Sequence, residues 1–473
     1  SYTSGTAELV THNFIDTSIR AHVTENSTLA TEVAVGYIFG GGIGAIVGSS
    51  SSGSFLIQAT NCAISSKVAG NSTVEMKSRD YGMAVGVVGI AAFSYKKLSL
   101  TAQNVTILFD VSDSSHVQTF IQYTYCYGCT IAGLAVSSVD APTSLNVSTA
   151  TIRVRVQYNS ALSHYVNTYG RGISCVGFAS YSFRAYQRTV VANSSIVFLL
   201  SENSTVSIHS GQNSGGHALL GMAAYAAGMC NGCAVDGTSV SNLSIAFLIA
   251  NHSYIRDSPP LNYGATVGGV TSSFGVTCHG CNITAFVQNN SAILSSLWPV
   301  SYVGVLSIVL TNGAGTFSVE DCSLQWCIDA SSNLTTRSDT VYSLTTFPVV
   351  PSTNFSANNR SDHVCPATDF SRLLPPSRGG EGDGPPPSST RSASPGFSAS
   401  RSLSVEGGGT ESQSTSLSKT LLFPQQPSTA TESNNDDVDV PSPMSEVSQT
   451  TPRTATLSVQ IHINTTDAPQ PPI

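Results

Sequence analysis

The feature that most constrains this chain is a short apolar motif, centred on glycine, that recurs at a near-constant period. Its glycines are successively 45, 44, 44, 44 and 48 residues apart and comprise Gly44, Gly89, Gly133, Gly177, Gly221 and Gly269. A fixed period of this length is typical of a stack of similar structural units. We therefore expect most of the chain to form a repeat architecture.

A second marker keeps the same period. Asparagine occupies most of the positions 18 residues before these glycines, as at Asn26, Asn71 and Asn203. Residues 152–157 between such markers alternate apolar and polar side chains, which is the pattern of a half-buried strand. Asparagine tolerates left-handed turns, and in a stack its side chain can bond to the next asparagine. Each unit is predicted to contain an Asn turn, a strand, another Asn turn and a glycine-centred strand.

Composition favours an all-β fold, because charged residues are only 10% of the chain and no long window has helical spacing. We predict a right-handed parallel β-helix, or solenoid, in which each unit of about 44 residues makes two coils of about 22. The alternative is a β-propeller, whose four-stranded blades have a similar length of about 40 to 45 residues. Neither Trp298 nor Trp326 is followed by the Asp of that family's signature, so we favour the solenoid.

The composition changes towards the C-terminus. We assign residues 1–345 to the repeat domain, 346–365 to a transition segment and 366–473 to a disordered stalk rich in Ser, Pro, Thr and Gly. The stalk holds too few apolar residues to offset the entropy of ordering the chain. In an extracellular protein, a Ser/Thr/Pro tract is typical of an O-glycosylated stalk.

Three Cys-x-x-Cys elements, two of them nine residues after a repeat glycine, dominate the cysteine pattern. We favour disulfides within or between neighbouring coils, and we expect the last two elements to stack on each other. Buried free thiols and zinc ligands are the alternatives. The disulfide candidates are Cys126, Cys129, Cys230, Cys233, Cys278, Cys281, Cys322 and Cys327.

Asn-x-Ser/Thr triplets, the acceptors of N-linked glycans, are frequent along the repeats. We predict that several carry glycans, although a repeat that needs Asn in a turn beside Ser or Thr would produce the same pattern through hydrogen bonding alone. The candidate positions are Asn26, Asn71, Asn104, Asn146, Asn193, Asn203, Asn242, Asn251, Asn282, Asn289, Asn333, Asn354 and Asn359.

Motifs for nucleotide binding and hydrolysis are weak or missing. The run from Gly42 to Gly48 resembles a dinucleotide fingerprint, but its last glycine is one position late. No Gly-x-Ser-x-Gly elbow occurs, and the carboxylates that glycoside hydrolysis needs as a pair are scattered. We predict no catalytic residue, cofactor or metal, and interpret His217 and His279 as turn or surface histidines. A net charge of −8 makes nucleic acid an unfavourable partner.

The Asn-Cys-x-Ile and Asn-x-Ser-Ile-x-Phe units, the Val-Gly-Ile-Ala runs and the Ser/Pro tail resemble those of membrane-associated, repeat-containing surface proteins of free-living kinetoplastid protists. The resemblance covers about residues 20–340 and matches no catalytic motif. It implies a large glycosylated protein at the extracellular face of the plasma membrane, with a membrane tether outside this fragment.

These observations predict a non-enzymatic cell-surface solenoid that functions in adhesion, ligand contact or coat formation. Its partner would be a surface ligand, either carbohydrate or protein. The alternative is a β-helix that binds or cleaves polysaccharide, which clustered Tyr, Trp and acidic side chains would favour.

Overall fold

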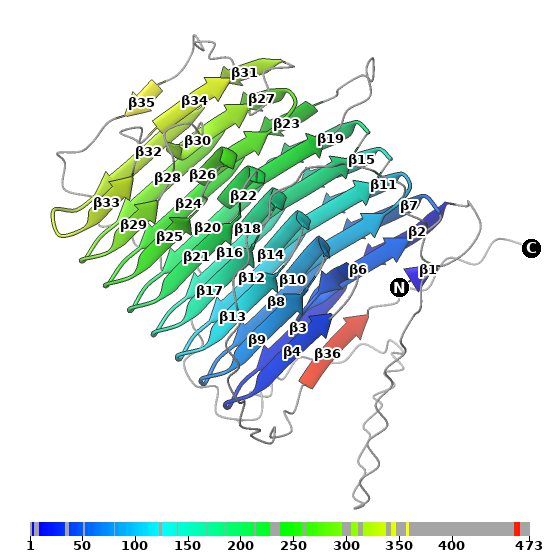
Figure 1. Ribbon diagram of the computed structural model, residues 1–473, viewed down its shortest axis with the longest axis horizontal. Coiled ribbons are helices and arrows are strands. Elements are labelled where there is room, and N and C mark those ends of the chain that lie inside the picture. Colours follow the sequence, from blue (N-terminus) through cyan, green and yellow to red (C-terminus); the bar gives the residue numbers. More distant parts are fainter. Residues whose placement is uncertain are drawn as a thin grey trace, which may run out of the picture. The chain divides into compact units, whose positions relative to one another are not determined.

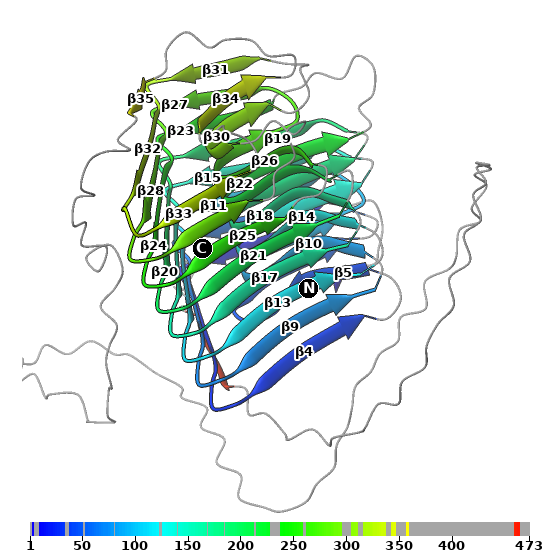
Figure 2. The same cartoon turned by 60° about the vertical axis from the view of Figure 1, so that its left-hand side comes forward.

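A computed structural model describes residues 2–3, 9–33, 37–50, 53–79, 81–122, 125–139, 141–167, 169–183, 185–211, 214–227, 237–258, 262–295, 304–310, 316–336, 342–346, 356–358 and 458–463. The chain divides into two compact units, Ser1–Ser377 with Thr454–Ile473, and Arg378–Arg453; the described residues all belong to the first. They form a β-solenoid with four parallel sheets, as Figures 1 and 2 show. The solenoid predicted from the repeats is confirmed, and the propeller is excluded because equivalent strands of successive units pair in parallel.

The four sheets are named A to D. Sheet A contains β1 (Tyr2–Thr3), β6 (Ala45–Ser50), β10 (Tyr81–Ser94), β14 (Tyr125–Val139), β18 (Tyr169–Phe183), β22 (Ser214–Ala227), β26 (Asn262–Ser272), β30 (Gly304–Leu310) and β34 (Tyr342–Thr346), with β5 (Tyr37–Gly41) beside β10. Sheet B contains β2 (Val10–Ile15), β7 (Phe55–Thr60), β11 (Leu98–Gln103), β15 (Thr143–Ser148), β19 (Gln187–Ala192), β23 (Gly237–Ser241), β27 (Val276–His279) and β31 (Phe317–Glu320).

Sheet C contains β3 (Thr17–Val23), β8 (Ala63–Val68), β12 (Thr106–Val111), β16 (Thr151–Val156), β20 (Ser195–Leu200), β24 (Ser244–Ile249), β28 (Asn282–Val287), β32 (Ser323–Ile328), β35 (Ser356–Asn358) and β36 (Ser458–Ile463). Sheet D contains β4 (Thr28–Val33), β9 (Thr73–Ser78), β13 (His116–Ile121), β17 (Ala161–Val166), β21 (Thr205–Ser210), β25 (Tyr254–Ser258), β29 (Ala292–Ser295) and β33 (Asn333–Thr336). Within the described residues, no helix has the length and apolar character needed to cross a membrane.

Each repeat makes one coil, so the prediction of two coils per repeat is wrong. A coil takes one strand from each of sheets B, C, D and A in turn, for example β7, β8, β9 and β10. In sheet B, Phe55 pairs with Leu98 and Leu98 pairs with Thr143, which lie 43 and 45 residues further on. Three strands of 6 residues, one of 14 and their short corners account for the whole period.

The repeat glycines form a column along sheet A because no side chain fits there. Gly89 pairs with Gly133, and the column continues through Gly177 and Gly221 to Gly269. A Cβ added to any of the five would lie 1.8 to 2.0 Å from the carbonyl oxygen of the next coil. The first four also have φ between 127° and 152°, a region that L side chains rarely adopt. Gly44 lies one position out of register, since Gly89 pairs with Ala45.

Inward-facing apolar side chains of all four sheets form one core that runs through the coils. In sheet C, Phe109, Val154, Phe198 and Phe247 stack in register and are no more than 2% exposed. Burial of each Phe side chain contributes about 1.5 to 3 kcal/mol. Large and small residues share the column, as is expected of interdigitated packing.

Two described strands lie beyond the predicted repeat domain. β35, in the predicted transition segment, adds to sheet C beside β32. β36 lies within residues 366–473, the predicted stalk, and pairs antiparallel with β3. This pairing covers an otherwise open edge of sheet C (Figure 1). The other residues of 366–473 lie outside the described residues.

Candidate functional site

Asparagines of the predicted glycan sites occupy the corners on either side of sheet C, in the left-handed turn conformation. Asn71 has a φ of 57°, and its side-chain amide donates to Oδ1 of Asn26 in the preceding coil at 3.0 Å. Asn104, Asn242 and Asn289 donate in the same way to asparagines one coil earlier. The predicted Asn turns are thus linked from coil to coil by their own side chains.

A serine ladder at the corner between sheets C and D accompanies these asparagines. The backbone N–H of each serine donates to the hydroxyl of the serine in the next coil at 3.1 or 3.2 Å. The ladder comprises Ser27, Ser72, Ser115, Ser160, Ser204, Ser253, Ser291 and Ser332. Asn beside Ser therefore has a structural reason at this corner, independent of any glycan.

The corner asparagines are mostly accessible, but they are crowded. Asn26, Asn71, Asn104, Asn193, Asn203, Asn242 and Asn289 are exposed, and Asn251 is half-buried. Neighbouring coils are only about 4.8 Å apart, which is less than the width of a sugar ring with its hydration. If these positions carry glycans, adjacent coils of one ladder cannot both be fully occupied.

The remaining glycan candidates lie elsewhere on the solenoid. Asn146 is half-buried on the outer face of β15. Asn282 and Asn333 are exposed at the starts of β28 and β33. Asn354 and Asn359 lie outside the described residues.

One Cys-x-x-Cys element forms a disulfide. Cys126 and Cys129, both in β14, are bonded to each other, and their Cα atoms are 6.2 Å apart. Cys327 is also disulfide-bonded. Cys230 and Cys233 lie outside the described residues as well.

Three further disulfide candidates are buried free thiols, contrary to the prediction. They are Cys278, Cys281 and Cys322, and the backbone N–H of Cys281 donates to Sγ of Cys322 at 3.3 Å. A hydrogen bond that the Cys281 thiol donates to the Cys278 side chain, the largest cause, together with burial raises the pKa of the Cys281 thiol. The expected stacking of the last two Cys-x-x-Cys elements is also wrong, because Cys278 pairs with Val240. More residues separate β22 from β23 than separate the corresponding strands β18 and β19. Positions counted from the repeat glycine therefore no longer match between these coils.

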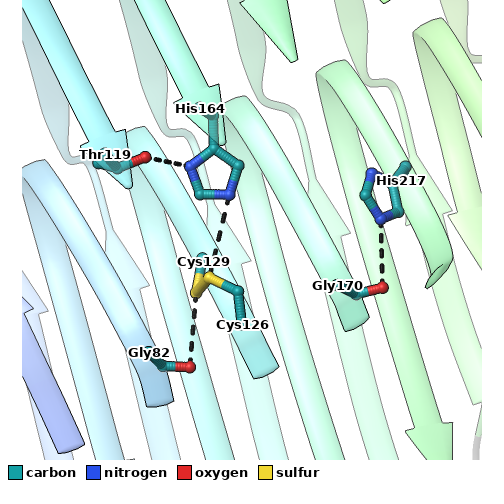
Figure 3. The surroundings of a disulfide bond; sticks show 7 residues. All are labelled: Gly82, Thr119, Cys126, Cys129, His164, Gly170 and His217. Carbon is teal, nitrogen blue, oxygen red and sulfur yellow. Dashed lines mark hydrogen bonds between the residues drawn. A yellow bond between two sulfur atoms is a disulfide. The ribbon is translucent and has the colours of Figure 1, made fainter. Parts of the chain in front are cut away.

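Two buried histidines, His164 and His217, lie near the disulfide (Figure 3). His164 contacts the Thr119 hydroxyl through Nδ1, and its Nε2 lies 3.9 Å from Sγ of Cys126. Nε2 of His217 lies 3.2 Å from the carbonyl oxygen of Gly170. Burial lowers the pKa of His164 to about 3 and that of His217 to about 4, so both are neutral at pH 7. The interpretation of His217 as a turn or surface residue is therefore wrong.

His279 does lie on the surface, at the end of β27, where Nδ1 is 3.7 Å from an Asp321 carboxylate oxygen. No group of three or more His, Cys, Asp or Glu side chains suited to a metal ion occurs in the part of the chain that the structure describes.

The most chemically distinctive cluster lies on the outer side of sheet A, where the long strands fold back on themselves. A Cβ on Gly128 would lie 2.4 Å from the carbonyl oxygen of Val136, later in the same strand, and Gly172 meets Ser180 equally closely. The fold-back brings residues of the first half of each strand onto residues of the second half. The resulting tyrosine–arginine cluster comprises Tyr127, Ser137, Arg171, Tyr181 and Tyr225.

The rings of this cluster are parallel. The Tyr127 and Tyr181 rings stack with centroids 4.1 Å apart, and the Tyr181 and Tyr225 centroids are 6.4 Å apart. The guanidinium carbon of Arg171 lies 5.3 Å from the centroid of the Tyr225 ring, a cation–π contact. Tyr181 is fully buried, whereas Tyr127, Arg171 and Tyr225 remain partly accessible.

Several polar atoms of the cluster are buried. They are the hydroxyls of Ser137 and Tyr181 and Nε of Arg171. Burial is the main reason that the pKa of Tyr181 lies above its ordinary value, although Arg171 and Tyr127 nearby oppose the shift. Burial would lower the pKa of Arg171, but the closeness of Tyr225, Tyr181 and Tyr127 outweighs it and the pKa is raised. The guanidinium is therefore charged.

Reasoning from the sequence did not find this cluster, although part of its signal is periodic. Tyr181 and Tyr225 each follow a repeat glycine by four residues, and Tyr127 and Arg171 each precede one by six. The fold-back that joins the two sets depends on Gly128 and Gly172, which lie outside the main glycine column.

Comparison with known proteins does not supply a relative: no family model, curated protein or solved structure matches this chain.

Proposed function

We propose that this protein is a non-enzymatic contact protein of the cell surface, whose solenoid presents repeated side chains to a ligand, to another cell or to a coat. The observation that carries the proposal is the strict register of the outward columns. On the outer face of sheet B, Ser99 pairs with Ser144 and Thr101 pairs with Asn146, one coil apart. Such columns repeat polar groups every 4.8 Å or so along a rigid support.

Repetition suits weak contacts made many times over. A ligand that engages several coils at once gains affinity through effective concentration, without any single strong site. The coil-to-coil ladders of Asn and Ser at the corners stiffen this support, because each coil is hydrogen-bonded through side chains as well as backbone.

Two features support an extracellular location. The Cys126–Cys129 disulfide is of a kind that persists mainly in oxidising compartments. Most of the described corner asparagines in glycosylation triplets are exposed.

The test is surface labelling of the native cells with a membrane-impermeant amine reagent, followed by peptide mapping with and without a glycosidase. The proposal predicts labelled protein, with glycans on some of the exposed corner asparagines but not on adjacent positions of one ladder. Recovery of unlabelled protein with unglycosylated asparagines and a reduced Cys126–Cys129 pair would refute the proposed cell-surface location.

A further inference from the structure

The strand at one end of sheet B has an open edge. β2 is the terminal strand of that sheet and pairs only with β7 in the described part of the chain (Figure 1). The backbone N–H of Val10 donates to the carbonyl oxygen of Ser54, in the adjoining coil, at 2.9 Å. Since backbone groups alternate in direction along a strand, those of Thr11 and Asn13 point away from β7. Their N–H and C=O groups are therefore placed to pair with another strand.

Other edges at this end of the solenoid are protected, whereas β2 is not. β36 covers β3 in sheet C, and β4 in sheet D carries the exposed side chain of Glu32. Covering strands and charged side chains both prevent edge-to-edge association. β2 contains no Lys, Arg, Asp, Glu, Pro or Gly; Leu9 precedes it and Ile15 ends it. At 63% and 58%, these two are the most exposed large apolar side chains of the described residues.

The sequence of this edge is self-complementary. Residues 9–15 read Leu-Val-Thr-His-Asn-Phe-Ile, so the class of side chain is symmetric about His12. A two-fold interface requires such symmetry, because residue i of one copy contacts residue j of the other while j contacts i. With the axis at His12, the antiparallel pairs between two copies are Leu9–Ile15, Val10–Phe14 and Thr11–Asn13.

We propose that β2 is a self-association strand, through which two copies of this chain form an antiparallel, two-fold symmetric dimer. In each Thr11–Asn13 pair the two residues exchange N–H···O bonds, because the backbone groups of both point towards the partner strand. The Leu9–Ile15 pairs remove exposed apolar surface from water. This inference goes beyond the proposed function and does not depend on where the protein resides.

The proposed interface is small. β1 and β36 each add a strand beyond the first coil, in sheets A and C, so contact between the two copies is confined to sheet B. One strand pair buries less surface than the interface of most stable dimers. We therefore expect a dissociation constant in the micromolar range or weaker.

The experiment is sedimentation velocity on the full chain, over a concentration series that extends into the high-micromolar range. Asn13→Pro removes an N–H that points to the second copy, and it spares the pairing with β7 because that N–H is not used there. Ile15→Lys places a charge on the edge. Tyr158→Lys is the matched control, since Tyr158 is 53% exposed but lies at a corner between β16 and β17, away from the edge.

We expect the wild type to dimerise, and Asn13→Pro and Ile15→Lys each to raise the dissociation constant by about tenfold or more. Tyr158→Lys should change it by less than about twofold. Far-ultraviolet circular dichroism checks that each variant is folded, and either edge variant alone is sufficient for the comparison. A wild type that is monomeric at every concentration, or a dimer that the folded edge variants do not weaken, would overturn the proposal.

The register is tested with a mixture of two chains, one carrying Thr11→Cys and the other Asn13→Cys. Directly opposite residues of a hydrogen-bonded antiparallel pair have Cα atoms about 5.5 Å apart. Dibromobimane, which bridges two close thiols, should therefore link the two chains in the mixture. Two Thr11→Cys chains are offset along the strand and should be bridged far less. Equal bridging in the mixture and in Thr11→Cys alone would overturn the register centred on His12.

Discussion

Replacement of a single column glycine by alanine tests why the repeat period exists. In Gly89→Ala the new Cβ would lie 1.9 Å from the carbonyl oxygen of Gly133, far inside van der Waals contact. The φ of 127° at Gly89 is also a conformation that alanine disfavours. Gly86→Ala, three residues earlier in β10, is the matched control, since its nearest contact would be the Ala91 Cβ at 3.3 Å.

The magnitude follows from two costs. Backbone strain at such a φ amounts to about 1 to 3 kcal/mol. Relief of the clash must separate two coils locally and weaken two or three ladder hydrogen bonds, each worth about 1 kcal/mol. We therefore expect Gly89→Ala to lower the free energy of unfolding by about 3 to 6 kcal/mol, and Gly86→Ala to change it by less than about 1 kcal/mol.

The assay is urea unfolding followed by far-ultraviolet circular dichroism, with both variants and the wild type at the same pH and salt. The midpoint of Gly89→Ala should fall well below that of Gly86→Ala. A Gly89→Ala midpoint equal to that of the control would refute the steric explanation of the glycine column.

Three further predictions concern the buried histidines, the corner asparagines and the ion pair on sheet C. Because burial lowers the pKa of His164 to about 3 and of His217 to about 4, from 6.5, the unfolded chain takes up protons that the folded chain does not. The free energy of unfolding should be at its full value above about pH 6.5 and lower by about 3 to 5 kcal/mol at about pH 4.5. Urea unfolding at these two pH values measures the difference. His164→Gln should reduce it, and an unchanged difference would contradict the account. At Asn71, with its φ of 57°, Ala should be less stable than Gly by about 1 kcal/mol in thermal unfolding, and equal melting temperatures would argue against a conformational role. Asp110→Asn should cost about 1 kcal/mol by breaking the bidentate pair with Arg155, less at high salt, and a salt-independent loss would contradict an electrostatic origin.

The repeat itself could be predicted because its causes are local. A position that admits no Cβ, such as Gly133, and a turn that needs a left-handed residue, such as Asn71, leave a mark in the sequence at every coil. The all-β solenoid follows from these marks. The number of coils per repeat does not follow from them, because the sequence signal of a corner between sheets is the same whether a coil has two such turns or four.

The candidate site was beyond prediction for a different reason. Tyr127 and Tyr181 stack only because β14 and β18 each fold back at Gly128 and Gly172, and the pair is 54 residues apart in the sequence. The register partner of Cys278 could not be predicted from its spacing to the repeat glycine. One coil is longer than the others, so in that coil the same spacing from the glycine of sheet A does not give the same register position in sheet B.

The most direct test of the account is the distance between residues at equivalent positions of neighbouring repeats. Thr101 and Asn146 are register partners on the outer face of sheet B, so cysteines placed at both should lie about 5 Å apart, whereas Thr101 and Val190 are two coils apart and should lie about 10 Å apart. Dibromobimane becomes fluorescent when it bridges two close thiols. The account predicts bridging in the Thr101→Cys/Asn146→Cys variant and none in Thr101→Cys/Val190→Cys. No bridging in the first variant, or equal bridging in both, would contradict a solenoid with one coil per repeat.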